Sequence, residues 1–194
     1  YVLDRELILN KTFYNKIFKQ QGNFVNYIIT YSPHTPFTTE KEVGKILAEE
    51  KYGKDNIPKL SEEDCAKMAA SETDNMVGLL IQALKDNGLY DNTVIVAYAD
   101  HYLYTLDDKS ILDKYKETSN NLINHTPFFI WSSDLGQLTS ISKVNMQMDI
   151  LPTVLNLFGI DYNSNNYIGH DILSNDFKGY AFFSDYSWYD GKVY

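Results

Sequence analysis

The sequence has a single cysteine, no long apolar run and fewer basic than acidic side chains. One cysteine, Cys65, excludes a disulfide within the chain, and its place in the first turns of an expected helix favours a small buried residue over a nucleophile. The absence of 18 consecutive apolar residues predicts no membrane-spanning helix, and no signal peptide opens the chain. A net charge of −9 disfavours a nucleic-acid partner and electrostatic docking on an anionic membrane.

What the sequence does contain is an alternation of helical patterns and apolar runs. The apolar spacing and the flanking cap residues predict three helices, over 5–19, 61–86 and 148–158. Short runs rich in β-branched and aromatic residues predict three strands, over 24–31, 93–99 and 126–131. Such alternation predicts one α/β domain over 1–194, with a mostly parallel sheet flanked by helices in which these strands are neighbours. The end of the chain, 180–194, predicts a β-hairpin that turns at Asp190-Gly191.

Ionisable residues follow two of the predicted strands. In open α/β sheets, ligands bind beyond the carboxyl ends of the strands. Asp100 and His101 leave the strand over 93–99 and can present a carboxylate oxygen and an imidazole nitrogen to one divalent cation, a donor set suited to Mn²⁺ or Zn²⁺ and tolerant of Mg²⁺. An Asp-His pair alone can equally well cap a loop. His34 follows the strand over 24–31, and an isolated histidine in a loop is more often structural or solvated than functional. The presence of candidate residues at two neighbouring strand ends strengthens the ligand-binding interpretation of both.

A family resemblance rests on an ordered set of segments. They are Ser32-Pro33-His34-Thr35-Pro36-Phe37, then 72–78 and 84–96, the pair Asp100-His101, 126–131, and 149–160. In this order they resemble the extracellular catalytic domain of lipoteichoic acid synthase-like phosphoglycerol transferases, membrane-anchored enzymes of the alkaline phosphatase/sulfatase superfamily. The resemblance covers nearly the whole chain, and it implies an alkaline phosphatase/sulfatase-like fold that lacks its N-terminal portion.

The resemblance also implies roles for the candidate residues. Asp100 and His101 would be two ligands of a catalytic Mn²⁺ or Mg²⁺, and His34 would bind the phosphate or assist proton transfer to the leaving group. The donor would be the phospholipid phosphatidylglycerol and the acceptor a growing glycerophosphate polymer, with a covalent threonine intermediate. The implied location is the cell membrane, reached through an N-terminal anchor that is missing here, with the catalytic domain on the extracellular face.

Two departures from the family pattern bear on activity. The nucleophilic threonine and the first acidic ligand of the family would precede Tyr1, and no threonine of this chain matches the nucleophile. We therefore expect an incomplete metal site and an inactive fragment. In addition, Ala99 stands before the Asp-His pair, where the family often has glycine.

Other candidates and other functions remain open at this point. His125 either caps a strand or contacts substrate, and His170 matches a structural turn of the family. Trp188 and nearby tyrosines either line a groove for a glycerol or sugar chain or, as we favour, pack across the hairpin. A sulfatase or a phosphoethanolamine transferase shares the fold and the Asp-His pair. A non-catalytic module that binds cell-wall polymer is a further alternative.

Overall fold

The computed structural model describes residues 2–114 and 125–193. Its internal contacts divide the chain into two compact units, Tyr1–Gly136 and Gln137–Tyr194. Each unit is described by itself below, and the expected single domain over 1–194 stays a prediction. Among the described residues, no helix combines the length and the apolar character needed to cross a bilayer.

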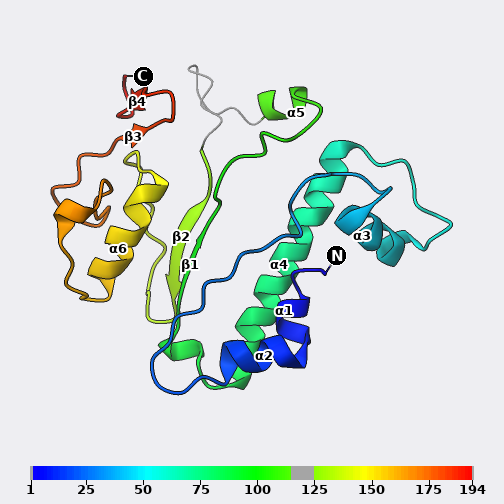
Figure 1. Cartoon of the computed structure of the whole chain (residues 1–194), viewed down its shortest axis with the longest axis horizontal. Coiled ribbons are helices and arrows are strands. Elements are labelled where there is room, and N and C mark those ends of the chain that lie inside the picture. The colour runs from blue at the N-terminus through cyan, green and yellow to red at the C-terminus, as the bar shows by residue number, and fades with distance from the viewer. Residues whose placement is uncertain (1, 115–124, 194) are drawn as a thin grey trace. The chain divides into compact units, whose positions relative to one another are not determined.

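The first unit is built on a long helix, α4, which spans Glu62–Asp86 (Figure 1). The sequence prediction of this helix is confirmed, and its start is fixed by a capping box. The Asp64 backbone N–H donates to Ser61 Oγ at 3.1 Å, and the Ser61 backbone N–H donates to Asp64 Oδ2 at 3.2 Å. One face of α4 is buried against the shorter helices of the unit.

The shorter helices are α1 (Glu6–Leu9), α2 (Lys11–Phe18), α3 (Glu42–Tyr52) and α5 (Ser110–Asp113), with a 3₁₀ turn η1 at Tyr90–Asn92. The single helix expected over 5–19 is therefore two helices. Asn10 breaks it, because its backbone is extended and its side chain accepts hydrogen bonds from the N–H groups of Thr12 and Phe13. The break creates a new helix start with its own N-cap.

The strands of the first unit's sheet run antiparallel, whereas a mostly parallel sheet was predicted. Strand β1 (Val94–Tyr98) pairs with β2 (Phe128–Ser132) in an antiparallel ladder, in which Tyr98 lies opposite Phe128. The α/β class is confirmed, but both sheets of the described residues are antiparallel, so the mostly parallel arrangement was wrong for these strands. A continuous apolar run indicates burial on two faces, yet it does not encode the direction of the neighbouring strand.

The third expected strand, over 24–31, is not part of a ladder in the described residues. Its backbone is irregular, and Val25, Tyr27 and Ile29 are 75–94% exposed. One contact ties it to the sheet, because the Tyr27 hydroxyl lies 3.3 Å from the Tyr98 hydroxyl at the end of β1. The strand predicted over 24–31 was therefore wrong, because a β-branched and aromatic composition does not supply the neighbouring strand that a ladder requires.

The second unit contains the 3₁₀ turn η2 (Gln147–Asp149), the helix α6 (Ile150–Leu157), the 3₁₀ turn η3 (Ser164–Asn166) and the strands β3 (Ala181–Phe182) and β4 (Trp188–Tyr189). The helix predicted over 148–158 corresponds to η2 and α6 together. The predicted hairpin is confirmed by the antiparallel pairing of β3 with β4. Its turn lies at 183–187 rather than at Asp190-Gly191, because the Phe183 N–H donates to the Ser187 carbonyl at 3.0 Å.

The buried carboxylate of Asp149 organises the second unit. Its Oδ2 accepts from the Met146 N–H at 2.9 Å and its Oδ1 from the His170 N–H at 2.7 Å. The neighbouring Thr153 hydroxyl accepts from the Ile172 N–H at 3.0 Å. These bonds hold the turn at His170 onto the start of α6, which agrees with a structural position for that histidine.

Candidate functional site

Asp100 and His101 leave the sheet directly at the end of the β1 ladder. The Ala99 N–H still donates to the Pro127 carbonyl at 3.1 Å, so the pairing with the β2 strand continues to the residue before the pair. The chain then bends at Asp100. The Asp100 side chain is 85% exposed and that of His101 is 40% exposed. The ladder thus delivers both side chains to an accessible edge.

The His101 ring is held in one tautomer. Its Nδ1 lies 2.8 Å from the Tyr102 carbonyl oxygen. A carbonyl oxygen only accepts, so Nδ1 carries the proton and the lone pair of the neutral ring lies on Nε2. The ring also packs against Tyr104, with centroids 4.7 Å apart. A histidine that gives its second N–H to a backbone carbonyl is the usual arrangement of a metal ligand.

The two donors are spaced closely enough to share one cation. His101 Nε2 lies 3.7 Å from Asp100 Oδ2. Two ligand atoms at roughly 2.1 Å from one ion, with an angle of about 90–110° between the bonds, lie about 3.0–3.4 Å apart. A small side-chain rotation closes the difference. The pair therefore fits a divalent cation with two donors, and no cluster of three or more such side chains able to hold a metal occurs within 2–114 and 125–193.

His34 repeats the same local arrangement on another loop. Its Nδ1 lies 2.8 Å from the Thr35 carbonyl oxygen, so Nδ1 is protonated here as well. The exposed ring stacks on Tyr31 at 5.2 Å with an interplanar angle of 11°. Stacking and the carbonyl contact fix the orientation of the ring. Nε2 is then the nitrogen that can contact a phosphate oxygen.

A buried aspartate near the start of the chain anchors the loop of His34. Asp4 Oδ1 accepts from the N–H groups of Tyr31 at 2.8 Å and Ser32 at 3.1 Å. Its Oδ2 accepts from the Thr73 hydroxyl of α4 at 2.8 Å. The carboxylate therefore fastens the segment before His34 to the long helix. Sequence analysis missed Asp4, because no local pattern marks a contact across 69 residues.

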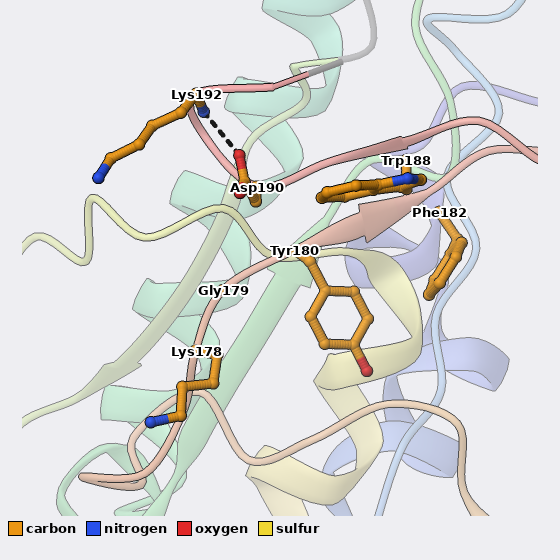
Figure 2. A pocket seen from close by; sticks show the side chains of 7 residues that line it. All are labelled: Lys178, Gly179, Tyr180, Phe182, Trp188, Asp190 and Lys192. Carbon is orange, nitrogen blue, oxygen red and sulfur yellow. Dashed lines mark hydrogen bonds between the residues drawn. The ribbon is translucent and has the colours of Figure 1, made fainter.

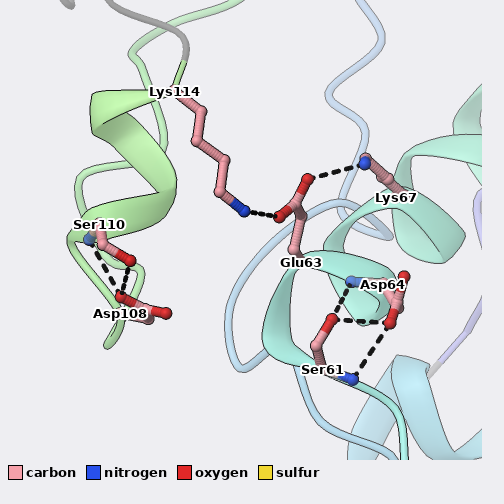
Figure 3. Close-up of polar contacts among 7 residues, drawn as sticks. All are labelled: Ser61, Glu63, Asp64, Lys67, Asp108, Ser110 and Lys114. Carbon is pink, nitrogen blue, oxygen red and sulfur yellow. Dashed lines mark hydrogen bonds and ion pairs between the residues drawn. The ribbon is translucent and has the colours of Figure 1, made fainter.

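The loop that follows His101 is fastened to the start of α4. Glu62 accepts from the backbone N–H groups of Asp107 and Asp108, both at 2.8 Å. Glu63 forms ion pairs with Lys67 at 2.7 Å and with Lys114 at 2.5 Å (Figure 3). These contacts connect the polar stretch after the Asp100-His101 pair to a rigid element.

One buried cluster joins the two candidate loops. We name it the loop cluster, and its buried members are Phe37, Cys65, Ala69, Leu106 and Ile111. Phe37 follows His34 by three residues, and Leu106 follows His101 by five. Both loops therefore pack on the same face of α4. Whether His34 shares a cavity with the Asp100-His101 pair stays a prediction.

Cys65 belongs to the loop cluster and is not a reactive thiol. Its side chain is buried, and this burial raises the pKa of the thiol, with a smaller contribution from Asp64. A raised thiol pKa lowers the fraction of thiolate, which is the nucleophilic form. The interpretation of Cys65 as a packing residue fits this environment.

His125 lies at the same end of the ladder as the Asp100-His101 pair. It precedes Pro127, whose carbonyl accepts from Ala99, by two residues. Its ring is exposed. A substrate contact by His125 stays a prediction.

Comparisons with known proteins show what the chain is similar to. A model of the sulfatase family matches residues 4–160, more than half of the chain. The lipoteichoic acid synthase of Staphylococcus saprophyticus is 30% identical over 91% of the chain, and that of Staphylococcus aureus strain USA300 is 29% identical over the same share. The crystal structure of the lipoteichoic acid synthase LtaP from Listeria monocytogenes superposes with a TM-score of 0.69 at 28% identity, over 92% of this chain.

The chain is shorter than these relatives. It spans 28% of the length of the two staphylococcal synthases and 44% of the solved Listeria chain. The resemblance to lipoteichoic acid synthases that the motifs indicated is nevertheless confirmed over nearly the whole chain.

Proposed function

The chain belongs to the sulfatase family, and on that basis we propose that it forms part of a metal-dependent phosphoglycerol transferase of the lipoteichoic acid type. The donor is phosphatidylglycerol and the acceptor is a growing glycerophosphate polymer. Transfer proceeds through a covalent threonine intermediate, and none of the threonines of this chain matches that nucleophile. Similarity to lipoteichoic acid synthases over 91% of the chain supports this proposal over a sulfatase.

The observation that carries the proposal is the Asp100-His101 pair with its fixed tautomer. The Tyr102 carbonyl holds the proton on His101 Nδ1, so Nε2 and the Asp100 carboxylate are the two protein donors. When bound there, Mn²⁺ or Mg²⁺ lowers the pKa of a coordinated hydroxyl and offsets negative charge on the transferred phosphoryl group. Asp100 and His101 hold and orient the ion, and they take no part in proton transfer.

His34 acts on the phosphate and on the leaving group. Because the Thr35 carbonyl already accepts the Nδ1 proton, the imidazolium form of His34 carries its second proton on Nε2. That proton is donated first to a phosphate oxygen and then to the oxygen of the departing diacylglycerol. Stacking on Tyr31 keeps the ring in position for both contacts.

The lipid donor determines where the reaction takes place. Phosphatidylglycerol carries two acyl chains and stays in the bilayer, so the transferase works at the cell membrane. Its catalytic part lies on the extracellular face, where the polymer is built. This location follows from the proposed donor and is tested with it.

A paramagnetic titration tests the metal pair without any need for turnover. Mn²⁺ is added to the 194-residue chain, and the ring signals of His34, His101 and His170 are followed by NMR. We expect weak binding that broadens the His101 signal first. Two protein donors hold a divalent ion less firmly than the full ligand set of a closed site.

Three substitutions make this test specific. Asp100→Asn removes a charged donor and should abolish the selective broadening of His101. Asp91→Asn, the same change at the other end of β1, should leave it intact, and so should His34→Ala. Selective broadening that persists in Asp100→Asn would exclude the ligand assignment. Its loss in His34→Ala would move that residue from the phosphate to the metal.

A further inference from the structure

A pocket of about 540 Å³ lies in the second unit, on the β3–β4 hairpin. Figure 2 shows the side chains that line it, which are Lys178, Tyr180, Phe182, Trp188, Asp190 and Lys192. Ligand pockets commonly have volumes of about 300–1,000 Å³. The residues fall into an aromatic part and a cationic part, and the proposed transfer chemistry uses neither.

The aromatic part comes from the hairpin itself. Phe182 and Trp188 are direct cross-strand partners, which agrees with the place across the hairpin favoured from the sequence. The two side chains nevertheless remain 51% and 45% exposed. The Tyr180 ring meets Phe182 edge to face at 5.4 Å, and its hydroxyl lies 3.2 Å from His170 Nδ1. Packing thus orders the rings and still leaves aromatic surface open to the pocket.

The cationic part consists of Lys178 and Lys192. Both side chains extend to the side of the pocket away from Phe182 and Trp188 (Figure 2). Neither ammonium group forms an ion pair with an acidic side chain of the described ranges. The one carboxylate in the pocket, Asp190, is engaged by the backbone, because its Oδ1 accepts from the N–H groups of Lys192 and Val193, both at 2.8 Å.

Two ammonium groups against the one carboxylate of Asp190 leave the lining of the pocket with a net positive charge, which favours an anionic ligand, and lysine is a common phosphate-binding residue. Exposed aromatic faces favour a neighbouring group with C–H surface. A ligand that satisfies both parts carries a phosphate next to a short polyol or sugar.

We propose that this pocket binds a phosphorylated polyol, with the phosphate at Lys178 and Lys192 and the polyol carbons against Phe182 and Trp188. The choice of a glycerophosphate unit of the acceptor polymer as the occupant rests on the proposed function. The Asp190 carboxylate then accepts hydrogen bonds from polyol hydroxyls. The pocket is a binding subsite for the chain that is being extended, and no bond is made or broken in it.

The two tryptophans of the chain allow the pocket to be tested with an internal reference. Trp188 lines the pocket, whereas Trp131 lies in β2 against Tyr90, at a ring distance of 4.9 Å. Glycerol 1-phosphate is titrated into the ¹⁵N-labelled 194-residue chain while both indole N–H signals are recorded. We expect a saturable shift of the Trp188 signal alone. Glycerol should give no shift at the same concentrations, and inorganic phosphate should bind more weakly.

Charge-removing variants then separate the two lysines from the rest of the surface. Lys178→Gln and Lys192→Gln should each weaken binding about two- to fivefold, as expected for exposed charge pairs. Lys59→Gln, an exposed lysine of the first unit, should have no effect. Added salt should weaken the binding of the unmodified chain. Unchanged indole signals in the free variants show that they are folded.

Several results would overturn the assignment. They are an unmoved Trp188 signal, equal affinity for inorganic phosphate, and unchanged affinity in both lysine variants. Asp100→Asn should bind glycerol 1-phosphate like the unmodified chain, so a failure of the metal pair leaves this test intact. Loss of binding in Asp100→Asn would show that the signal reports the metal pair and not the pocket.

Discussion

Replacing Leu106 by alanine tests whether the loop cluster holds both candidate loops. Leu106 is 1% exposed and packs with Phe37, Cys65, Ala69 and Ile111. It lies on the loop after His101, and Phe37 lies on the loop after His34. The substitution removes apolar atoms from the one buried cluster that contains residues from both loops and from α4.

The expected cost follows from full burial. Three carbon atoms are lost, and at about 0.8 kcal/mol for each buried methylene the transfer contribution is about 2.4 kcal/mol. Incomplete collapse of the cavity adds to this, and buried Leu→Ala changes cost roughly 2–5 kcal/mol in total. We therefore expect the free energy of unfolding to fall by about 3 kcal/mol. Leu138→Ala, the same change at a side chain that is 99% exposed, serves as the control.

Two measurements together decide the outcome. Urea unfolding at equilibrium gives the loss of stability, and NMR of the histidine rings reports on the two loops. In Leu106→Ala we expect the His34 and His101 ring signals both to shift, while the Leu138→Ala control moves neither. A cost below about 1 kcal/mol would contradict the packing argument. A shift of His101 alone would show that the cluster does not connect the loops.

Two further predictions concern α4 and its surroundings. Glu63→Gln removes the ion pairs with Lys67 and Lys114, and because both lysines are largely exposed we expect a loss of about 0.5–1 kcal/mol that shrinks in high salt. Urea unfolding at low and high salt measures this loss, and an equal loss in both would contradict an ionic origin. Cys65 should react with an aromatic disulfide reagent at pH 8 far more slowly than the unfolded chain does, because burial raises its pKa. Reaction at the rate of the unfolded chain would contradict the buried position.

Local signals predicted the elements whose ends are determined locally. The helix α4 was found because Ser61 is a favourable N-cap residue before an acidic first turn and Gly88, with φ +66°, follows its end. Strand β1 was found because five consecutive apolar residues favour a strand, although its residues are half-buried or exposed and not buried on both faces. In both cases, the residues that specify the element lie within it or next to it.

Predictions failed where two positions carry equivalent local signals, or where the structure depends on a partner that is distant in sequence. The Asp185 and Asp190 carboxylates both accept backbone N–H groups from residues two positions on, so each marks a turn equally well. The hairpin turns near Asp185 because that register pairs Phe182 with Trp188 across the strands. The antiparallel direction of the β1–β2 pair likewise depends on a partner about 30 residues away, which no local pattern specifies.

The candidate site also contains residues that a local pattern marks and residues that act through distant contacts. Asp100, His101 and His34 were recognisable because each follows an apolar run, where α/β proteins place their ligands. The residues that hold them, Asp4 and Leu106, carry no such mark. Asp4 acts through hydrogen bonds across 28 and 69 residues, and Leu106 acts through burial in a cluster assembled from distant segments.

The two histidines share a property that links local structure to the proposed chemistry. Each gives its Nδ1 proton to the carbonyl of the next residue, Thr35 or Tyr102, so the tautomer is set by backbone that is adjacent in sequence. Each therefore presents Nε2 to a ligand. At His101, the neighbouring Asp100 carboxylate makes that nitrogen one half of a cation site. Beside His34, the Asp4 carboxylate is already occupied by backbone and hydroxyl donors, so the loop supplies a ring nitrogen without a second charged donor. The Nε2 lone pair thus suits a metal ligand at His101, whereas His34 contacts a phosphate oxygen through Nε2 when that nitrogen is protonated in the imidazolium form.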